Sequence, residues 1–396
     1  MQSSAVIVTS LRTPVGKAKR GALRFMRPEE MGAVAVRTAL NHTPNLSAEE
    51  IDDVLIGCAF PEGSQGMNVG RIIAGRAGLP DSVPGATVNR FCSSGLQTIA
   101  MANQAIGLGQ AECIIAGGSE SMTLVPMSGY YFQPDPETAE QRPEVYVSMG
   151  NTAENLAQKY DISREDQDLF ALRSHERALA AQSAGLFEEE LIPLDIKQNS
   201  IQNGTPKMVS YQFSMDEGPR ADTSLEALSR LRPVFRSGGS VTAGNSSQMS
   251  DGAAATVVMS EGMAQRLGAK PLARMVGFAV AGVAPELMGI GPVPAIKNVL
   301  KQTGLSLDQI GLIELNEAFA AQALAVIKEA NLDESIVNVQ GGAIALGHPL
   351  GCTGAKLTAT LLHAMNRGGI QYGLCTMCIG GGMGAAAIFE NLSNSG

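Results

Sequence analysis

The sequence predicts an α/β fold made of two related halves, with a helical and loop region inserted into the first half. Three observations predict it: one segment that occurs in both halves, a strand-and-glycine unit that also occurs twice, and the composition. The 396 residues include 45 glycines and no tryptophan, and aromatic residues make up only 4%. Such a chain depends on tight strand-to-helix turns and close backbone approach, which is typical of α/β enzymes.

The first repeat relates residues 47–60 to residues 306–319. The two segments, SAEEIDDVLIGCAF and SLDQIGLIELNEAF, align without a gap and share a serine, an isoleucine, an aliphatic residue and a final Ala-Phe. Each copy reads as a Ser-capped turn followed by a buried strand. Chance similarity is the alternative, but a second pair of segments agrees in the same order.

The second repeat relates residues 111–118 to residues 373–382, each a strand that ends in paired glycines. In the second half the chain returns at once through residues 383–389, whereas in the first half the matching return comes only at residues 249–258. The long stretch between them is therefore an insertion, and long insertions often form lids or binding surfaces.

These repeats predict three regions. The N-terminal half is expected to comprise residues 1–120 and 248–270, the inserted loop or lid domain residues 121–247, and the C-terminal half residues 271–396. Within the insertion, an amphipathic helix is predicted across residues 153–184, followed by polar, turn-rich sequence to residue 240.

The net charge and the composition argue against some classes of function. The net charge of −9 argues against nucleic acid as a partner, because phosphate backbones are bound by basic surfaces. No apolar run approaches the ~20 residues of a membrane helix, so no membrane span is expected. No signal peptide is apparent either, so the six cysteines are expected to be free thiols in the cytoplasm, with oxidised pairing as the alternative.

A candidate nucleophile lies in the segment VNRFCSSGLQTIA, where a strand ends at Cys92 and an apolar-periodic helix begins. A thiol at a helix N-terminus meets oriented N–H groups and the positive end of the helix dipole. Such a site predicts a cysteine pKa lowered from ~8.5 toward ~7 or below. The alternative is that Cys92 is only a small buried hydrophobic residue, as most cysteines are.

A candidate base lies in the segment GGAIALGHPLGCTG, where glycines and a proline hold His348 in a rigid turn. The chain has only four histidines. His42 is expected in a polar loop, His175 on a solvated helix face, and His363 packed within a helix or on its surface. His348 is therefore the best base available.

A third candidate segment contains Cys375 and Cys378 in the sequence CTMCIGGGMG. The Cys-x-x-Cys spacing suggests a redox or zinc site. However, side chains three apart on a strand face opposite sides of the sheet, so the two thiols should diverge and no metal is expected. Asn316 adds an amide at the end of the repeated strand, and catalytic groups of α/β sheets gather at such strand ends.

At these residues the chain resembles the thiolase family over essentially its whole length. Four active-site segments occur in family order, and a fifth resembles the segment beside the pantetheine of coenzyme A (CoA). They are NRFCSSG at 89–95, NEAFA at 316–320, GGAIALGHPLG at 341–351, CIGGGMG at 378–384 and TAGNSSQMSDGAA at 242–254. The resemblance implies duplicated βαβαβαββ domains in an α-β-α-β-α core.

The resemblance also implies roles. Cys92 would be the nucleophile that becomes acylated, His348 would take its proton, and Cys378 would move the α-proton of the acetyl unit. One oxyanion hole would use the N–H groups of Cys92 and Gly380, and the other His348 with a water held by Asn316. CoA is implied as a substrate, with no tightly bound cofactor. Its contacts would be Arg220, Ser247, Ala318, Phe319 and Met149.

One departure from the family pattern bears on the substrate. Short-chain biosynthetic members carry a histidine where this chain has Ser148, and Phe91 stands where degradative relatives often have Gln or Leu. The expected activity is therefore reversible, CoA-dependent cleavage of 3-ketoacyl-CoA to acyl-CoA and acetyl-CoA in fatty-acid β-oxidation, with a preference for medium or long chains. A short-chain acetyl-CoA C-acetyltransferase is the alternative.

More remote alternatives are a condensing β-ketoacyl synthase, a structural zinc protein and a non-catalytic lipid- or acyl-CoA-binding relative. The synthase would need a second histidine in place of Cys378, and the non-catalytic relative would be expected to lose Cys92, His348 or Cys378. A homodimer or homotetramer is expected, and membership of a β-oxidation complex is left open.

Overall fold

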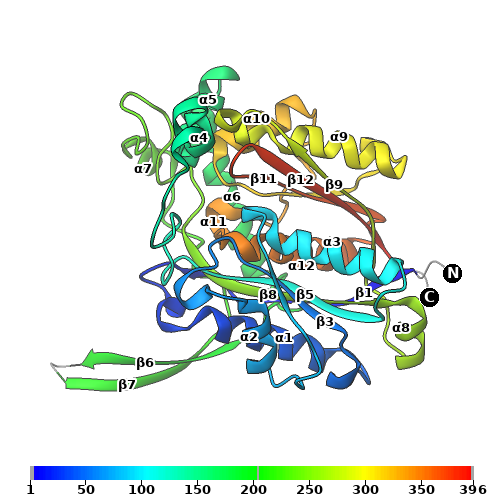
Figure 1. Cartoon of the computed structure of the whole chain (residues 1–396). Helices are drawn as coiled ribbons and strands as arrows, with labels where there is room; N and C mark the ends of the chain where they lie inside the picture. Colours follow the sequence, from blue (N-terminus) through cyan, green and yellow to red (C-terminus); the bar gives the residue numbers. More distant parts are fainter. Residues whose placement is uncertain (1–3, 203–204, 394–396) are drawn as a thin grey trace.

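The computed structural model describes residues 4–202 and 205–393, and it has five alternating layers of helices and sheet (Figure 1). Two helices, α3 (Ser94–Gly107) and α12 (Leu350–Gly368), lie in the middle layer. Strands pack on both sides of this pair, and further helices cover the outer faces of the strands. The predicted α-β-α-β-α core is confirmed.

The strands of the N-terminal half are adjacent in the order β1 (Ala5–Arg12), β8 (Ser250–Ser260), β5 (Cys113–Ser121), β3 (Asp53–Gly57) and β4 (Ala86–Val88). The last three are parallel, while β8 runs antiparallel to both β1 and β5. The returning strand that was predicted for the first half at residues 249–258 is therefore β8. The outer face is covered by α1 (Pro28–His42) and α2 (Val69–Arg76).

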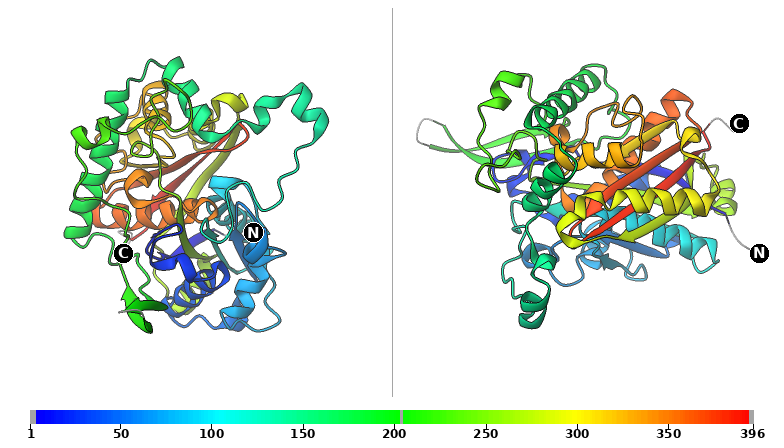
Figure 2. Two further views of the ribbon diagram at one scale, coloured as in Figure 1. Left: turned by 90° about the vertical axis from the view of Figure 1, so that its left-hand side faces the viewer. Right: turned by 90° about the horizontal axis from the view of Figure 1, so that it is seen from above.

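The strands of the C-terminal half follow the order β10 (Leu312–Leu315), β11 (Tyr372–Ile379), β12 (Met383–Asn391) and β9 (Ala273–Gly282). The helices α9 (Pro292–Thr303) and α10 (Ala320–Glu329) cover the outer face of these strands, as Figure 2 shows from above. One residue pair, Ile7 with Ala273, joins β1 to β9 and links the two halves into one ten-stranded sheet.

The sequence repeat is visible as matched local structure. Ser47 and Ser306 each open a short 3-10 helix with a capping box, Ala48–Glu50 in one half and Leu307–Gln309 in the other. The serine side chain accepts the backbone N–H of the third helical residue, and the side chain of that residue accepts the backbone N–H of the serine. These bonds satisfy N–H groups that have no partner within the helix. The strands β3 and β10 follow these turns.

The insertion differs from its prediction in two places. Instead of one helix across residues 153–184 there are two, α5 (Met149–Lys159) and α6 (Arg164–Ser183). The break follows from Asp161, which has a φ of 53°, and from Ser163, which starts α6 with its own capping box. In place of irregular chain, β6 (Leu194–Gln202) pairs with β7 (Thr205–Phe213) as a hairpin that extends from the body.

The remaining elements are short. They are β2 (Gly16–Lys17), α4 (Pro136–Gln141), α7 (Leu225–Ser229), α8 (Glu261–Leu267) and α11 (Ala343–Leu346). The segment that contains α4 projects from the body of the molecule (Figure 2). Among the described residues, no helix is both long enough and apolar enough to cross a bilayer.

The two central helices cross at glycines. A Cβ atom at Gly95 of α3 would lie 2.7 Å from the backbone nitrogen of Ala355, and one at Gly354 of α12 would lie 2.3 Å from that of Leu96. Only glycine permits such backbone contact. The helices begin just after Cys92 and His348, respectively, so this crossing brings together the two turns that carry these residues.

Candidate active site

The turn that carries Cys92 is a short 3-10 helix, Phe91–Ser93, between β4 and α3. Phe91 has a φ of 42°, which is rare for a bulky side chain and costs free energy. Asn89 Oδ1 accepts the N–H of Phe91 at 2.8 Å, and the Ser94 hydroxyl donates to the carbonyl of Phe91 at 2.7 Å. These bonds hold a strained turn that presents Cys92 at the start of α3.

Two backbone donors reach the sulfur of Cys92: its own N–H and the N–H of Gly380. Gly380 follows β11, and Gly381 and Gly382, with φ values of 81° and 86°, make the tight turn into β12. The N–H groups of Cys92 and Gly380 are thus both close to the sulfur, although they come from different halves of the fold.

The predicted low pKa of Cys92 is wrong. Burial raises the pKa of Cys92 to about 12, and the carboxylate of Glu120 adds to the increase, although the two backbone N–H groups oppose it. The side chain is only 8% exposed, so the loss of hydration of the thiolate outweighs the helix terminus.

Cys378 lies near the end of β11 and is fully buried. Burial and the neighbouring Cys92 raise the pKa of Cys378 well above its usual value. Cys378 packs with Met149, Ala318 and Phe319. Cys375, three residues earlier, instead packs in the core between the two sheet halves, so the two thiols of the Cys-x-x-Cys sequence diverge as expected.

The imidazole of His348 is held by two side chains. Its Nδ1 lies 2.5 Å from the hydroxyl of Thr353, and that hydroxyl donates its only proton to the carbonyl of Pro349 at 2.9 Å. Thr353 must therefore accept from Nδ1–H, which leaves Nε2 of the neutral ring unprotonated. Asn316 Nδ2 lies 3.3 Å from this Nε2.

The protonation state of His348 follows from its surroundings. Burial, together with the ammonium of Lys356, lowers the pKa of His348 to about 3. A neutral imidazole therefore coexists with a neutral Cys92 thiol at pH 7. The ring can act as a base through Nε2, but no thiolate–imidazolium pair exists before a substrate is bound.

The segment that resembles the pantetheine neighbour pairs with the strand end of the second half. Ser247 N–H donates to the carbonyl of Ala318 at 2.9 Å, Ser246 forms an isolated bridge with Phe319, and Ala320 N–H donates to the carbonyl of Asn245 at 2.9 Å. Met149 packs against the cluster that contains Ala318 and Phe319, and it lies next to Gly380. Four of the five residues predicted to contact CoA, all except Arg220, therefore lie close to the Cys378 side of the site.

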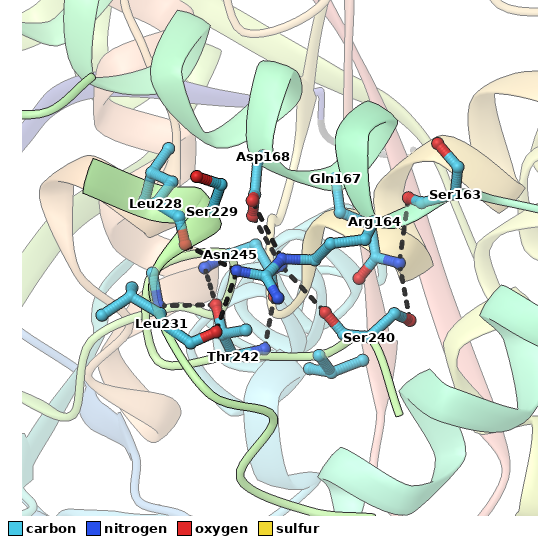
Figure 3. Close-up of polar contacts among 12 residues, drawn as sticks. Ser163, Arg164, Gln167, Asp168, Leu228, Ser229, Leu231, Ser240, Thr242 and Asn245 are labelled. Atoms are coloured by element: carbon cyan, nitrogen blue, oxygen red, sulfur yellow. Dashed lines mark hydrogen bonds and ion pairs between the residues drawn. The ribbon is translucent and has the colours of Figure 1, made fainter. Parts of the chain in front are cut away.

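Polar contacts with α6 fix this segment (Figure 3). Asn245 Nδ2 donates to Asp168 at 3.0 Å, and Arg164 donates to the same carboxylate at 2.9 Å. Gln167 bonds the hydroxyl of Ser240 at 2.9 Å, and Thr242 N–H donates to Asn245 Oδ1 at 2.8 Å. This network could not be predicted from the sequence, because α6 and residues 240–245 are far apart along the chain.

Arg220 does not belong to the apolar cluster that contains Cys378. It lines a cavity of about 470 Å³ together with two cations that the sequence analysis missed, Lys17 and Arg20. His175 lines the same cavity and is buried, so its predicted place on a solvated helix face is wrong. The reason is tertiary: the segment around Arg220 folds over this face of α6, and Arg220 N–H donates to His175 Nδ1 at 3.2 Å.

The other histidines and the cysteines carry no comparable arrangement. His42 is the last residue of α1 rather than part of a loop, and His363 is packed in α12, where its Nε2 meets the carbonyl of Ser10. All six cysteines are free and buried. Within residues 4–202 and 205–393, no group of three or more His, Cys, Asp or Glu side chains could hold a metal ion.

Comparisons with known proteins agree with this geometry. The thiolase N-terminal domain family matches residues 5–262, and the thiolase C-terminal domain family matches residues 269–391. The chain is 54% identical to a 3-ketoacyl-CoA thiolase of Bacillus subtilis over 98% of its own length and 99% of the relative's. It is 47% identical to the 3-ketoacyl-CoA thiolase FadA of Escherichia coli K12, with the same coverage.

Two solved structures are similar over nearly their full length. An acetyl-CoA acetyltransferase of Bacillus anthracis has a TM-score of 0.89 and 42% identity, and the match covers 99% of each chain. Human mitochondrial 3-ketoacyl-CoA thiolase also has a TM-score of 0.89, with 39% identity over 98% of this chain and 99% of the human chain. The fold and the matched families define an acyltransferase. The chain belongs to the thiolase family.

Proposed function

We propose that this thiolase catalyses the reversible, CoA-dependent cleavage of 3-ketoacyl-CoA to acyl-CoA and acetyl-CoA, with Cys92 as the nucleophile. The observation that carries the proposal is the arrangement around the Cys92 sulfur, where the Gly380 N–H and the neighbouring Cys378 meet it from the opposite half of the fold. The relatives named 3-ketoacyl-CoA thiolase support the degradative direction.

The first step is attack on the ketone carbon. His348 Nε2 takes the Cys92 proton, and the sulfur adds to the 3-keto carbon of the substrate. The N–H groups of Cys92 and Gly380 would hold the oxygen that becomes negative, and such donors contribute about 3 kcal/mol each. The bond between carbons 2 and 3 then breaks and leaves Cys92 as a thioester.

The leaving fragment is the enolate of acetyl-CoA. Cys378, whose high pKa keeps it protonated, would donate a proton to the enolate carbon. His348, by then protonated, and Asn316 would stabilise the enolate oxygen. After acetyl-CoA leaves, the Cys378 thiolate takes the proton of a second CoA thiol, whose sulfur attacks the thioester and releases an acyl-CoA shortened by two carbons. The leaving Cys92 sulfur recovers its proton from the protonated His348.

The substrate preference for medium or long chains rests on Ser148, which precedes Met149 at the start of α5. A serine is smaller than the histidine of short-chain members, and the next residue, Met149, packs in an apolar cluster with Met288 and Phe319. Thiolysis rates across a series of 3-ketoacyl-CoA chain lengths test this preference. Equal or faster cleavage of acetoacetyl-CoA than of long chains would instead favour the short-chain acetyltransferase reading.

We also propose that the enzyme works in the cytoplasm as a homodimer or homotetramer. Six free, buried thiols support a reducing compartment. An oligomer is supported by large apolar side chains that are well exposed, which are Met67 (92%), Tyr130 (63%), Tyr131 (80%) and Phe132 (61%). Light scattering on the purified protein measures the mass directly, and a monomer would exclude the assembly.

A further inference from the structure

His175 is a buried side chain on α6 whose second ring nitrogen has no protein partner. The residue is 5% exposed and lines the cavity of about 470 Å³. Nδ1 accepts the backbone N–H of Arg220 at 3.2 Å. Among the described residues, no hydrogen bond reaches Nε2. Nε2 does not belong to the fully buried atoms without a partner, so it is accessible from the cavity that His175 lines.

The hydrogen bond at Nδ1 decides what Nε2 can do. Because Nδ1 is an acceptor, the proton of the neutral ring is on Nε2, which is therefore a donor. Burial, followed by the charges of Arg220 and Lys17, lowers the pKa of His175 to about 4, so the ring is neutral at pH 7. The cavity thus contains a fixed, uncharged N–H group.

The same cavity gathers positive charge in an acidic protein. Lys17, Arg20 and Arg220 all line it, although the chain has a net charge of −9. Asp222 is the one acidic side chain in the lining, and it is paired with Arg220 at 3.0 Å. Flexible cations and a fixed neutral donor together suit a phosphate group, which needs both charge and directed hydrogen bonds.

The cavity also reaches two residues near the loop that carries His348. Gln248 and Ile344 form part of its lining. The carbonyl of Gln248 accepts the N–H of His348 at 3.3 Å. A ligand that fills the cavity would therefore extend from the cations to the loop that carries the catalytic imidazole.

We propose that His175 is a ligand-binding residue that donates Nε2–H to a phosphate oxygen of CoA, next to Lys17 and Arg20. This inference rests on the proposed function, which makes CoA the substrate. It adds a residue of α6 and two residues of the N-terminal segment to the predicted contact Arg220.

The decisive variant is His175→Asn. Asparagine can place an oxygen where Nδ1 accepts from Arg220, but it lacks an atom in the position of Nε2. Calorimetric titration should show CoA bound about tenfold more weakly than by the wild type. Pantetheine, which has no phosphate, should bind equally to both. His175→Ala should behave likewise, and the exposed His42→Ala should not change.

Two results would overturn the proposal. If His175→Asn binds CoA as tightly as the wild type, the ring only anchors Arg220. If the variant weakens CoA and pantetheine by the same factor, the change is structural rather than a lost phosphate contact. Binding is measured without turnover, so a wild-type enzyme that fails to cleave any 3-ketoacyl-CoA would defeat the proposed function while the titration still tests His175.

Discussion

Glu120 and Glu317 hold the two ends of the loop that carries His348. Glu120, at the end of β5, accepts the N–H of Gly351 at 2.8 Å, and Glu317, just after β10, accepts the N–H of Ile344 at 3.2 Å. Each carboxylate therefore comes from a different half of the duplicated fold. Both are fully buried, which raises their pKa values, and each has further hydrogen-bond donors around it.

Glu120→Gln should destabilise the enzyme by about 1–3 kcal/mol, because an amide cannot accept at both of its terminal atoms. In the wild type one oxygen of Glu120 accepts from Ala59 and Gly351, and the other from Gln65. Urea unfolding measures the loss, and kcat should fall with it because the His348 loop is less well held. The exposed Glu140→Gln is the control, and wild-type stability of Glu120→Gln would contradict the role.

Cys92→Ala should abolish the acyl-enzyme, which mass spectrometry detects after incubation with acetyl-CoA. Cys378→Ala should still become acylated but should lose on the order of 10²–10⁴-fold in carbon–carbon bond cleavage, the usual contribution of a general acid. Cys375→Ala is a matched control, because this buried thiol lies on the same strand, β11, but packs in a different apolar cluster from Cys378. Full thiolysis by the Cys378 variant would remove that residue from the mechanism.

Iodoacetamide should alkylate Cys92 faster by about tenfold per pH unit between pH 7 and pH 9, since only the thiolate reacts. This follows from the pKa of about 12, because the thiolate fraction rises steadily until the pH reaches the pKa. The mass of the Cys92 peptide gives the rate. His348→Asn should leave the profile unchanged, and a plateau near pH 7 would reveal a preformed ion pair.

The sequence was sufficient for the features that short segments encode. The matched segments around Ser47 and Ser306 predicted the duplication, and glycine-rich turns marked the places of Cys92 and His348. The layers and the place of Gly380 came from the family resemblance. These features depend on neighbours within a few residues. The boundaries of the three regions and the roles of the CoA contacts stay predictions.

The sequence was insufficient wherever distant residues decide the outcome. The pKa of Cys92 is set by burial among residues that are distant in the sequence, such as Met122 and Leu350, and this burial outweighs the local helix terminus. His175 is buried by the segment around Arg220, which is 45 residues away. The β6–β7 hairpin was missed although Asn203-Gly204, which lies outside the described residues, is a common hairpin turn sequence.

Thr353→Val should lower kcat on the order of 10–100-fold, because Nδ1–H of His348 loses its buried acceptor and the ring can take the other tautomer or move. Valine has nearly the same shape, so packing is little changed. Thr353→Ser keeps the hydroxyl and should restore most of the rate. Thiolysis kinetics against pH measure both variants, and a valine variant with wild-type kcat would show that Thr353 does not position the base.

Gly95→Ala and Gly354→Ala should each destabilise the enzyme by about 1–3 kcal/mol, the usual cost of forcing atoms into a packed core. The added methyl at either position would lie less than 3.0 Å from the backbone of the opposite central helix, so α3 and α12 would have to separate. Because these helices begin beside Cys92 and His348, acyl-enzyme formation should slow as well. Thermal unfolding and acylation rates measure the two effects.

Gly75→Ala in α2 is the matched control for these variants. No atom lies within 4 Å of the position its Cβ would take, so this change should be neutral or stabilise the enzyme by about 0.5–1 kcal/mol through the higher helix propensity of alanine. If Gly95→Ala and Gly354→Ala were as harmless as Gly75→Ala, the backbone contact between α3 and α12 would not be what aligns the thiol with the imidazole.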